Sequence, residues 1–387
     1  MARLRLPKPV VAFGSVSLLN DLSSEMIYPL LPLFLKGLGA SVAFIGVIEG
    51  IAETAASLLK LFSGWLADRF GRHRALALAG YVLASLTRPL LAFASAPWQV
   101  LVLRFVDRVG KGIRTAPRDA LIAHVSDAEA RATAFGFHRM MDNLGASLGP
   151  LLASAILLLA PENYRLVFLL ASMPALISLW VFHIGVPRVA VPVQSQRQHP
   201  LTGARALLKG RFGWFLVCVL LFTLGNSSDA FLLLRAEQAG MPHAWVPILW
   251  AGLNTGRTLL ATPCGMLADL LGRERVLLMG WLLYAGVYAG FAFAGSLWQI
   301  VALFGGYACY YGLVEGTERA LVADFAPESV RGQAYGLFHF VVGAGMLPAS
   351  VLFGALWEWA GVEVAFLTGA GLALMASALF WLSVRRA

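Results

Sequence analysis

Long apolar stretches follow one another along the chain and are separated by short polar connections. Each stretch holds about 20 residues or more, enough for one α-helix to cross a hydrocarbon layer about 30 Å thick. The short alternating segments of a membrane barrel are absent from the sequence. The pattern therefore predicts an all-α integral membrane protein with twelve transmembrane helices, at 10–35, 41–66, 75–95, 97–122, 132–160, 164–186, 212–237, 244–268, 276–295, 297–323, 332–357 and 362–384.

Composition supports a lipid environment. Hydrophobic residues make up 59% of the 387 positions and charged residues only 13%, whereas a soluble domain is about 25% charged. The net charge is +9, but the basic residues lie mostly in the connections between apolar stretches. That distribution is typical of membrane orientation and not of a nucleic-acid surface. We expect the lipid bilayer, and no nucleic acid, as a partner.

The same connections predict an orientation. The run from Val10 to Leu35 is too long for a signal-peptide core, so we interpret it as the first spanning helix. With both termini in the cytoplasm, the basic connections all face inward, as the positive-inside rule requires. We expect a multi-pass protein of the cell membrane (the inner or plasma membrane). The inward-facing basic residues are then Arg69, Arg72, Arg74, Arg131, Arg188, Arg197, Arg205, Lys209, Arg211, Arg273, Arg275, Arg331, Arg385 and Arg386.

The sequence also divides into two similar halves. A proline-containing basic stretch at 187–211 predicts a cytoplasmic linker between two six-helix bundles at 1–186 and 212–387. The segment Gly64-Trp-Leu-Ala-Asp68 returns 201 positions later as Gly265-Met-Leu-Ala-Asp269. A second block around Arg131 returns 200 positions later around Arg331. Two blocks at nearly one spacing favour duplication and two pseudo-symmetric bundles.

The repeated segment carries a family resemblance. Gly64-x-Leu-Ala-Asp68-Arg69-x-Gly71-Arg72-x-Arg74 resembles the loop motif between helices 2 and 3 of the major facilitator superfamily. The second copy is degenerate: Leu270 replaces the first arginine, and Glu274 intervenes between Arg273 and Arg275. The resemblance implies two bundles around a central cavity and alternating access. It gives a conformational role to Gly64, Asp68, Arg69, Gly71, Arg72, Gly265, Asp269, Gly272 and Arg273.

Two further motifs resemble the family. Arg108-x-x-x-Gly112-x-x-x-Ala116-Pro117 is similar to its helix-4 motif, in which the arginine faces the cavity; a structural ion-pair ladder is the alternative. The helix-5 sequence Gly145-x-x-x-Gly149-Pro150 resembles the motif of the 12-helix drug:proton antiporters. Small residues there also suit an ordinary packing seam. The resemblance favours export.

Acidic residues inside the predicted spans are the candidates for proton coupling. Ionised groups within a bilayer are costly and usually serve a function or pair with each other. A histidine titrates near physiological pH. The proton-coupling candidates are Asp21, Glu25, Glu49, Glu53, His138 and Asp142. Pairing of these acids with Arg88 or with the arginines of the fourth span is the alternative.

Other polar side chains within the spans are candidates for lining a substrate cavity. They include several positive groups, which favours a polar, anionic or zwitterionic substrate over a purely lipophilic cation. These cavity candidates are Asn20, Arg88, Arg104, Arg108, Asn143, Asn226, Asp229, Asn254, Arg257, Tyr311, Glu315 and His339.

The sequence offers no enzymatic or nucleotide-binding motif. It has no Walker A loop, no Gly-x-Ser-x-Gly elbow and no His-Glu-x-x-His, so we expect neither an enzyme nor a cofactor or metal. The leading hypothesis is a monomeric secondary transporter that exports a small polar or charged molecule by proton coupling. Uptake or exchange of an anionic metabolite is the runner-up. A membrane receptor or scaffold with the same fold is the alternative from another class.

Overall fold

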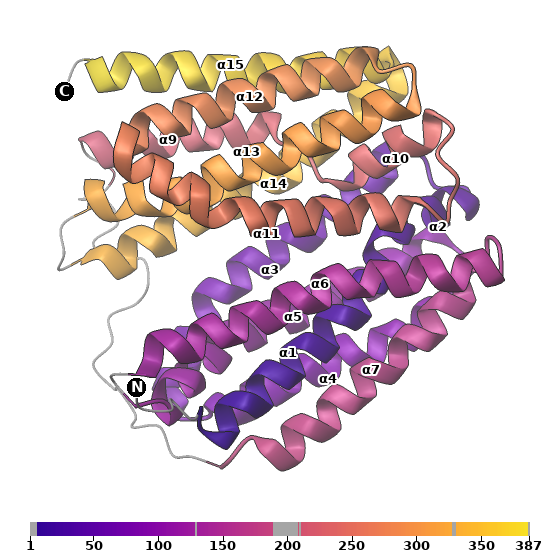
Figure 1. The fold of residues 1–387 in the computed structure, drawn as a ribbon, viewed down its shortest axis with the longest axis vertical. Helices are drawn as coiled ribbons and strands as arrows, with labels where there is room; N and C mark the ends of the chain where they lie inside the picture. Colours follow the sequence, from indigo (N-terminus) through magenta and orange to yellow (C-terminus); the bar gives the residue numbers. More distant parts are fainter. Residues whose placement is uncertain (1–5, 128–129, 189–207, 209, 327–329, 386–387) are drawn as a thin grey trace. The chain divides into compact units, whose positions relative to one another are not determined.

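A computed structural model describes residues 6–127, 130–188, 208, 210–326 and 330–385, and within these ranges the chain forms helices and no strand (Figure 1). Most of the linker predicted at 187–211 lies outside the described residues. The helices up to residue 188 are α1 (Lys8–Ile27), a 3₁₀ turn η1 (Tyr28–Leu30), α2 (Leu31–Gly37), α3 (Val42–Phe70), α4 (His73–Leu91), α5 (Pro97–Val125), α6 (Arg131–Leu159) and α7 (Tyr164–Gly185). The later helices are α9 (Arg211–Gly225), α10 (Ala230–Gln238), α11 (Val246–Leu271), α12 (Arg273–Phe293), α13 (Leu297–Phe325), α14 (Arg331–Ala360) and α15 (Val362–Arg385).

The chain forms two compact units. Unit 1 contains the described residues within Met1–Phe34, Leu58–His199 and His243–Ala251. Unit 2 contains those within Leu35–Ser57, Pro200–Pro242 and Gly252–Ala387. The unit boundaries therefore cut through α3 and α11, so that one part of each of these helices packs with each unit.

The two units repeat one packing scheme. In unit 1, α1 packs on α6 and α7, and α4 packs on α5 and α7. In unit 2, α9 packs on α14 and α15, and α12 packs on α13 and α15. The α4, α5 and α6 helices begin 200 residues before α12, α13 and α14. This correspondence supports the duplication that the sequence blocks indicate.

A small cap shows the repeat at the level of side chains. The side-chain oxygen of Gln99, in the first turn of α5, accepts hydrogen bonds from the backbone N–H groups of Ser95 and Ala96 at 2.7 and 3.3 Å. Gln299 does the same for Gly295 and Ser296 in α13, at 2.9 and 3.1 Å. Each bond satisfies a donor that would otherwise lack a partner at a helix start. The duplicated sequence thus folds into duplicated local structure.

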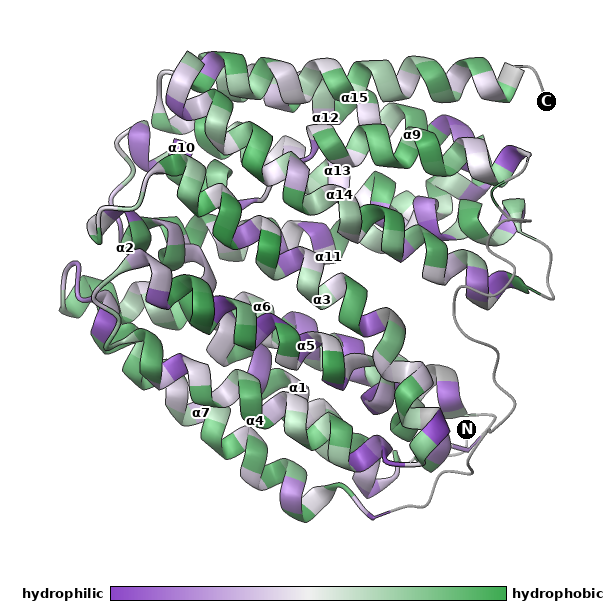
Figure 2. Ribbon diagram, turned by 180° about the vertical axis from the view of Figure 1, so that it is seen from behind, coloured by the Kyte–Doolittle hydropathy of each residue, from purple (hydrophilic) through white to green (hydrophobic). Residues whose placement is uncertain are grey.

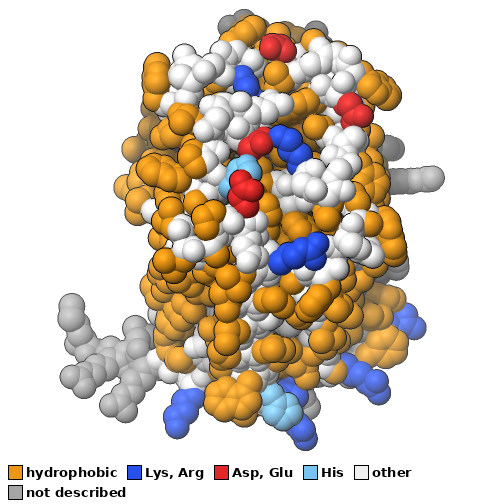
Figure 3. Space-filling model, turned by 90° about the vertical axis from the view of Figure 1, so that its right-hand side faces the viewer, with side chains coloured by type: hydrophobic (Ala, Val, Ile, Leu, Met, Phe, Trp, Pro, Cys, Tyr) orange, Lys and Arg blue, Asp and Glu red, His pale blue; other side chains and the backbone are white. Residues whose placement is uncertain are grey.

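The helices present apolar side chains to their surroundings. Leu159 is 89% exposed and Trp359 is 83% exposed, and apolar residues cover most of the helices and of the face drawn in space-filling form (Figures 2 and 3). Lipid can accept an apolar exterior of this kind, whereas water penalises it. The exterior fits a multi-pass membrane protein.

Eight helical segments within the described ranges are long and apolar enough to cross a membrane: Val42–Ala67, Thr133–Leu159, Tyr164–Gly185, Arg211–Gln238, Arg273–Phe293, Leu297–Phe325, Gln333–Ala360 and Val362–Val384. The four remaining predicted spans contain α1, α4, α5 and α11, which are helical. These four carry charged or polar residues within their apolar runs, which lowers their mean hydropathy. The polar residues in them include the candidate residues Asn20, Asp21, Glu25, Arg88, Arg104, Arg108, Asn254 and Arg257.

Candidate functional site

A close contact between α1 and α6 organises the polar residues of unit 1. A Cβ atom placed on Gly145 would lie 2.6 Å from the backbone oxygen of Leu18, and one on Gly149 would lie 2.4 Å from that of Leu22. Both separations are too short for a real side chain, so only glycine permits this approach. The helix-5 motif therefore brings the backbones of α1 and α6 together and fixes which side chains meet across them.

Two carboxylates face this contact. The hydroxyl of Ser17 in α1 donates a hydrogen bond to Asp142 in α6. His138 lies one turn earlier, with its Nδ1 atom 3.8 Å from Oδ2 of Asp142. Asp21 also packs here, since the Cβ of a side chain at Gly145 would lie 3.2 Å from its Cβ atom. Asp21 and Asp142 were both proton-coupling candidates from the sequence.

Asp21 is connected to a buried arginine through an amide. The Nδ2 atom of Asn20 donates to Oδ1 of Asp21 at 3.0 Å, and Nη2 of Arg88 donates to Oδ1 of Asn20 at 2.8 Å. Arg88 is only 2% exposed, and its Nε and Nη1 atoms have no hydrogen-bond acceptor among the described residues. A buried guanidinium with two open donors is costly unless water or an anion accepts from it.

Arg104 and Arg108 of α5 share one acidic partner on the same helix. Nη1 of Arg104 lies 3.7 Å and Nε of Arg108 lies 3.9 Å from Oδ2 of Asp107. The guanidinium of Arg104 also lies 5.0 Å from the centre of the Tyr28 ring. These contacts support the ion-pair alternative for part of this set. Arg108 is 9% exposed, so its charge lies within the unit and not on the surface.

Glu25 has a partner that sequence reasoning missed. The indole Nε1 of Trp250 donates to Oε2 of Glu25 at 2.7 Å, and the Trp250 ring lies 4.9 Å from that of Tyr28. Trp250 belongs to the part of α11 that packs with unit 1. The two residues are 225 positions apart in the chain, and no spacing rule connects them.

Unit 2 has a polar cluster of its own around Asp229, at the start of α10. The hydroxyl of Tyr307 donates to Oδ1 of Asp229 at 2.7 Å, and that of Tyr311 donates to Oδ2 at 2.8 Å. The Nδ2 atom of Asn226 lies 3.3 Å from the Tyr310 hydroxyl. Three tyrosines from one face of α13 therefore surround the break between α9 and α10. Asp229, Asn226 and Tyr311 were cavity candidates from the sequence, whereas Tyr307 was not among those candidates.

Charged residues of α11 and α13 continue this cluster. Arg257 forms an ion pair with Glu315 at 3.0 Å, and Glu315 also pairs with Arg319 at 3.0 Å. The Arg257 guanidinium lies 4.2 Å from the centre of the Tyr311 ring. Glu53 lies in the part of α3 that belongs to unit 2. The contacts bring the cavity candidates Arg257, Tyr311 and Glu315 together with Asp229.

The remaining predicted residues lie on α3, α6, α11 and α14. Glu49 is buried, at 2% exposed, in the unit 2 part of α3. Asn143 is half-buried on α6 and Asn254 is half-buried on α11. The ring of His339 packs against its neighbour Phe338. Their proposed roles stay predictions.

The two loop motifs share a glycine conformation. Gly71 has a φ of 62° and Gly272 has a φ of 93°, values that other residues rarely adopt. Gly64 packs close to Ala116, whereas Gly265 has open space around it. The side chain of Asp68 lies outside the described residues. The tight turn therefore explains the second glycine of each copy.

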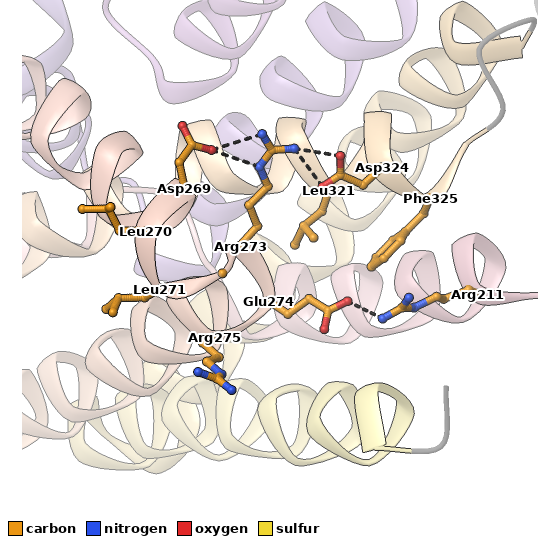
Figure 4. Close-up of a pocket in the computed structure, with 11 residues that line it drawn as sticks. Arg211, Asp269, Leu270, Leu271, Arg273, Glu274, Arg275, Leu321, Asp324 and Phe325 are labelled. Atoms are coloured by element: carbon orange, nitrogen blue, oxygen red, sulfur yellow. Dashed lines mark hydrogen bonds and ion pairs between the residues drawn. The ribbon is translucent and has the colours of Figure 1, made fainter.

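In the second copy, the motif residues line a hollow of about 600 Å³ in unit 2 (Figure 4). Arg273 lies between two acids, 3.1 Å from Asp269 and 2.7 Å from Asp324, and Arg211 pairs with Glu274. The motif arginine thereby ties the end of α11 to the end of α13. Glu274 therefore ties the start of α12 to the start of α9 through its ion pair with Arg211.

The comparisons with known proteins agree with this architecture. The family model for the Major Facilitator Superfamily matches residues 13–316 and 250–387. An uncharacterised MFS-type transporter of Methanocaldococcus jannaschii is 32% identical over 380 residues, which cover 97% of this chain and 94% of that protein. A multi-drug resistance efflux pump PmrA homolog of Lactococcus lactis is 32% identical over 140 residues, 35% of this chain and 34% of that one.

A solved structure of the nucleoside transporter NupG is similar in fold, with a TM-score of 0.82 at 15% identity, covering 97% of this chain and 99% of that chain. Fold and motifs together define a membrane transporter and not an enzyme. The chain belongs to the Major Facilitator Superfamily, which confirms the resemblance seen in its loop motif.

Proposed function

We propose that this transporter is proton-coupled and exports a small polar or charged molecule from the cytoplasm by alternating access. In this proposal the chain acts as a monomer in the cell membrane, with twelve spans in two six-helix bundles and both termini in the cytoplasm. Membership of the Major Facilitator Superfamily identifies the protein as a transporter. The coupling, the direction and the substrate class are the proposed parts.

The observation that carries proton coupling is the pair Asp21 and Asp142 at the α1–α6 contact. Asp21 accepts a hydrogen bond from Asn20 and has no ion pair within 4 Å in the described part of the chain. Two carboxylates near each other inside a span favour a state in which one of them holds a proton. The glycines that create this contact belong to the antiporter-like motif, so motif and acid pair form one structural unit.

Two observations support the other parts of the proposal. The relative in Lactococcus lactis, similar over part of the chain, is described as an efflux pump, which favours export. Arg88 keeps two buried nitrogens without a protein acceptor in the described ranges, which favours a substrate or water oxygen nearby. An anionic or zwitterionic molecule supplies such oxygens.

The test uses the purified full chain in proteoliposomes that contain a pH-sensitive dye. Small zwitterions and carboxylates are added one at a time, with and without an imposed pH gradient. We expect at least one compound to drive proton movement. Replacing Asp21 or Asp142 by asparagine should abolish gradient-driven accumulation and leave exchange of labelled compound without a gradient. Normal uphill transport in amide variants of all five acids (Asp21, Glu25, Glu49, Glu53 and Asp142) would refute proton coupling.

The second candidate function is uptake or exchange of an anionic metabolite, which the open donors of Arg88 also favour. The two functions predict opposite directions of substrate movement under the same pH gradient. A receptor or scaffold with this fold predicts no flux for any compound. The proteoliposome assay therefore separates the three.

A further inference from the structure

The helix in unit 2 that would form the seventh span is interrupted. The first part, α9, ends at Gly225 and the second, α10, begins at Ala230. The backbone between them is not helical, and the Asp229 side chain makes no capping hydrogen bond to α10. Interruptions of this kind within membrane transporters leave polar backbone groups available for ligands. The C-terminal end of α9 also contributes the negative end of its helix dipole.

The carboxylate at this interruption is held in place but not neutralised. Both of its oxygens accept hydrogen bonds from phenols, at 2.7 Å from Tyr307 and 2.8 Å from Tyr311. No ion pair of the described residues includes Asp229. Each oxygen retains a second lone pair for another donor. Tyr307 is fully buried and the Asp229 residue is half-buried, so the phenols hold the carboxylate from the interior of the unit.

The charges around Asp229 leave it available to a cation. Arg257, from α11, lies against the Tyr311 ring, whose hydroxyl holds Asp229, and its guanidinium is engaged by Glu315 at 3.0 Å. The tyrosine rings add electron-rich faces, which attract organic cations. The Tyr307 and Tyr311 rings are T-shaped to each other, with centroids 5.0 Å apart.

We propose that Asp229, with Tyr307, Tyr311 and the interrupted backbone at 226–228, is a recognition site for a protonated amino group. This inference rests on the proposed transport function and narrows the substrate to a molecule that carries an ammonium group. An ammonium group has three donors and a positive charge. In this proposal, Asp229 supplies the negative charge and one hydrogen-bond acceptor. The side-chain oxygen of Asn226 and the backbone carbonyls of the interruption supply acceptors for the other two N–H groups. A zwitterion satisfies this requirement together with the polar substrate class proposed above.

The experiment measures binding at equilibrium, without any gradient. The purified full chain in detergent is titrated with ethanolamine, 2-phenylethylamine and the neutral isostere 2-phenylethanol, and binding is followed by calorimetry and by thermal unfolding. We expect at least one amine to bind and to raise the unfolding temperature, and the alcohol to have no effect. Asp229→Asn should weaken amine binding by about tenfold or more, since a charged hydrogen-bond partner is lost.

Two variants distinguish recognition from a purely structural role of Asp229. Tyr311→Phe removes one hydrogen bond but keeps the charge, so it should retain most of the amine binding. Glu318→Gln changes another carboxyl of the same unit, whose Oε1 accepts from the Trp281 indole at 3.3 Å, and it should bind amines like the wild type. Equal amine binding in Asp229→Asn and wild type would overturn the inference, and so would binding of neither amine.

A sodium control completes the test. Stabilisation by NaCl, relative to KCl at the same ionic strength, that depends on Asp229 without amine binding would overturn the ammonium assignment. Failure of the inference and failure of the proposed function remain distinct. Amine binding without gradient-driven flux contradicts only proton coupling, whereas coupled flux with unchanged amine binding in Asp229→Asn contradicts only the ammonium site.

Discussion

Replacing Gly149 by alanine tests whether the α1–α6 contact is required. The new Cβ atom would lie 2.4 Å from the backbone oxygen of Leu22 and 3.1 Å from the Cβ of Glu25. The nearest atom is backbone and not the end of a flexible side chain, so relief requires the two helices to move apart. Such a movement would separate Ser17 from Asp142, which meet across the same contact.

The close approach of the two backbones sets the expected loss of folding stability in Gly149→Ala. Overpacking a well-packed interior by one methyl group costs about 1–3 kcal/mol. Alanine is otherwise a better helix former than glycine, by about 1 kcal/mol in aqueous peptides. This gain in helix propensity offsets part of the destabilisation that the clash causes. The control is Gly136→Ala on the same helix, because nothing lies within 4 Å of a Cβ placed there. The control receives the propensity gain without the clash.

The assay is thermal unfolding of the purified protein in detergent, together with gradient-driven flux in proteoliposomes. We expect Gly149→Ala to unfold at a lower temperature than wild type and to lose coupled flux, and Gly136→Ala to match or exceed wild-type stability. If the two variants are equally stable and equally active, the close α1–α6 contact does not organise the acid pair, and the reasoning fails.

Two further predictions concern one charged residue and one turn. Arg108→Lys should retain transport, because lysine keeps a positive charge near the acids, whereas Arg108→Gln should move the pH optimum of flux; an unchanged flux and pH profile in Arg108→Gln would contradict this. Gly272→Ala should destabilise the protein by about 1–3 kcal/mol, because Gly272 has a φ of 93°. Gly286→Ala in α12, with open space around its Cβ, is the matched control, and equal unfolding temperatures would refute the turn argument.

The sequence by itself determined the helical architecture and its repeat. A bilayer imposes a minimum length and an apolar character on each spanning helix, and each of the twelve predicted stretches contains helix in the structure. The duplicated segments around Asp68 and Asp269 indicated the two similar halves, and the helix starts 200 residues apart agree with them. Local motifs such as Gly145-x-x-x-Gly149 could be interpreted because close helix contact needs small residues at that spacing.

Only the tertiary structure decided which polar groups meet. An ion-pair ladder within the fourth span was one of the alternatives from the sequence, because its members are neighbours on one helix. The sequence could not connect Glu25 with Trp250 or Asp229 with Tyr307, because those pairs depend on the rotation and register of helices far apart in the chain. It also could not show that the compact units cut through α3 and α11. Hydropathy measures the transfer of each residue into lipid, whereas side-chain partners are set by how the helix faces turn toward one another.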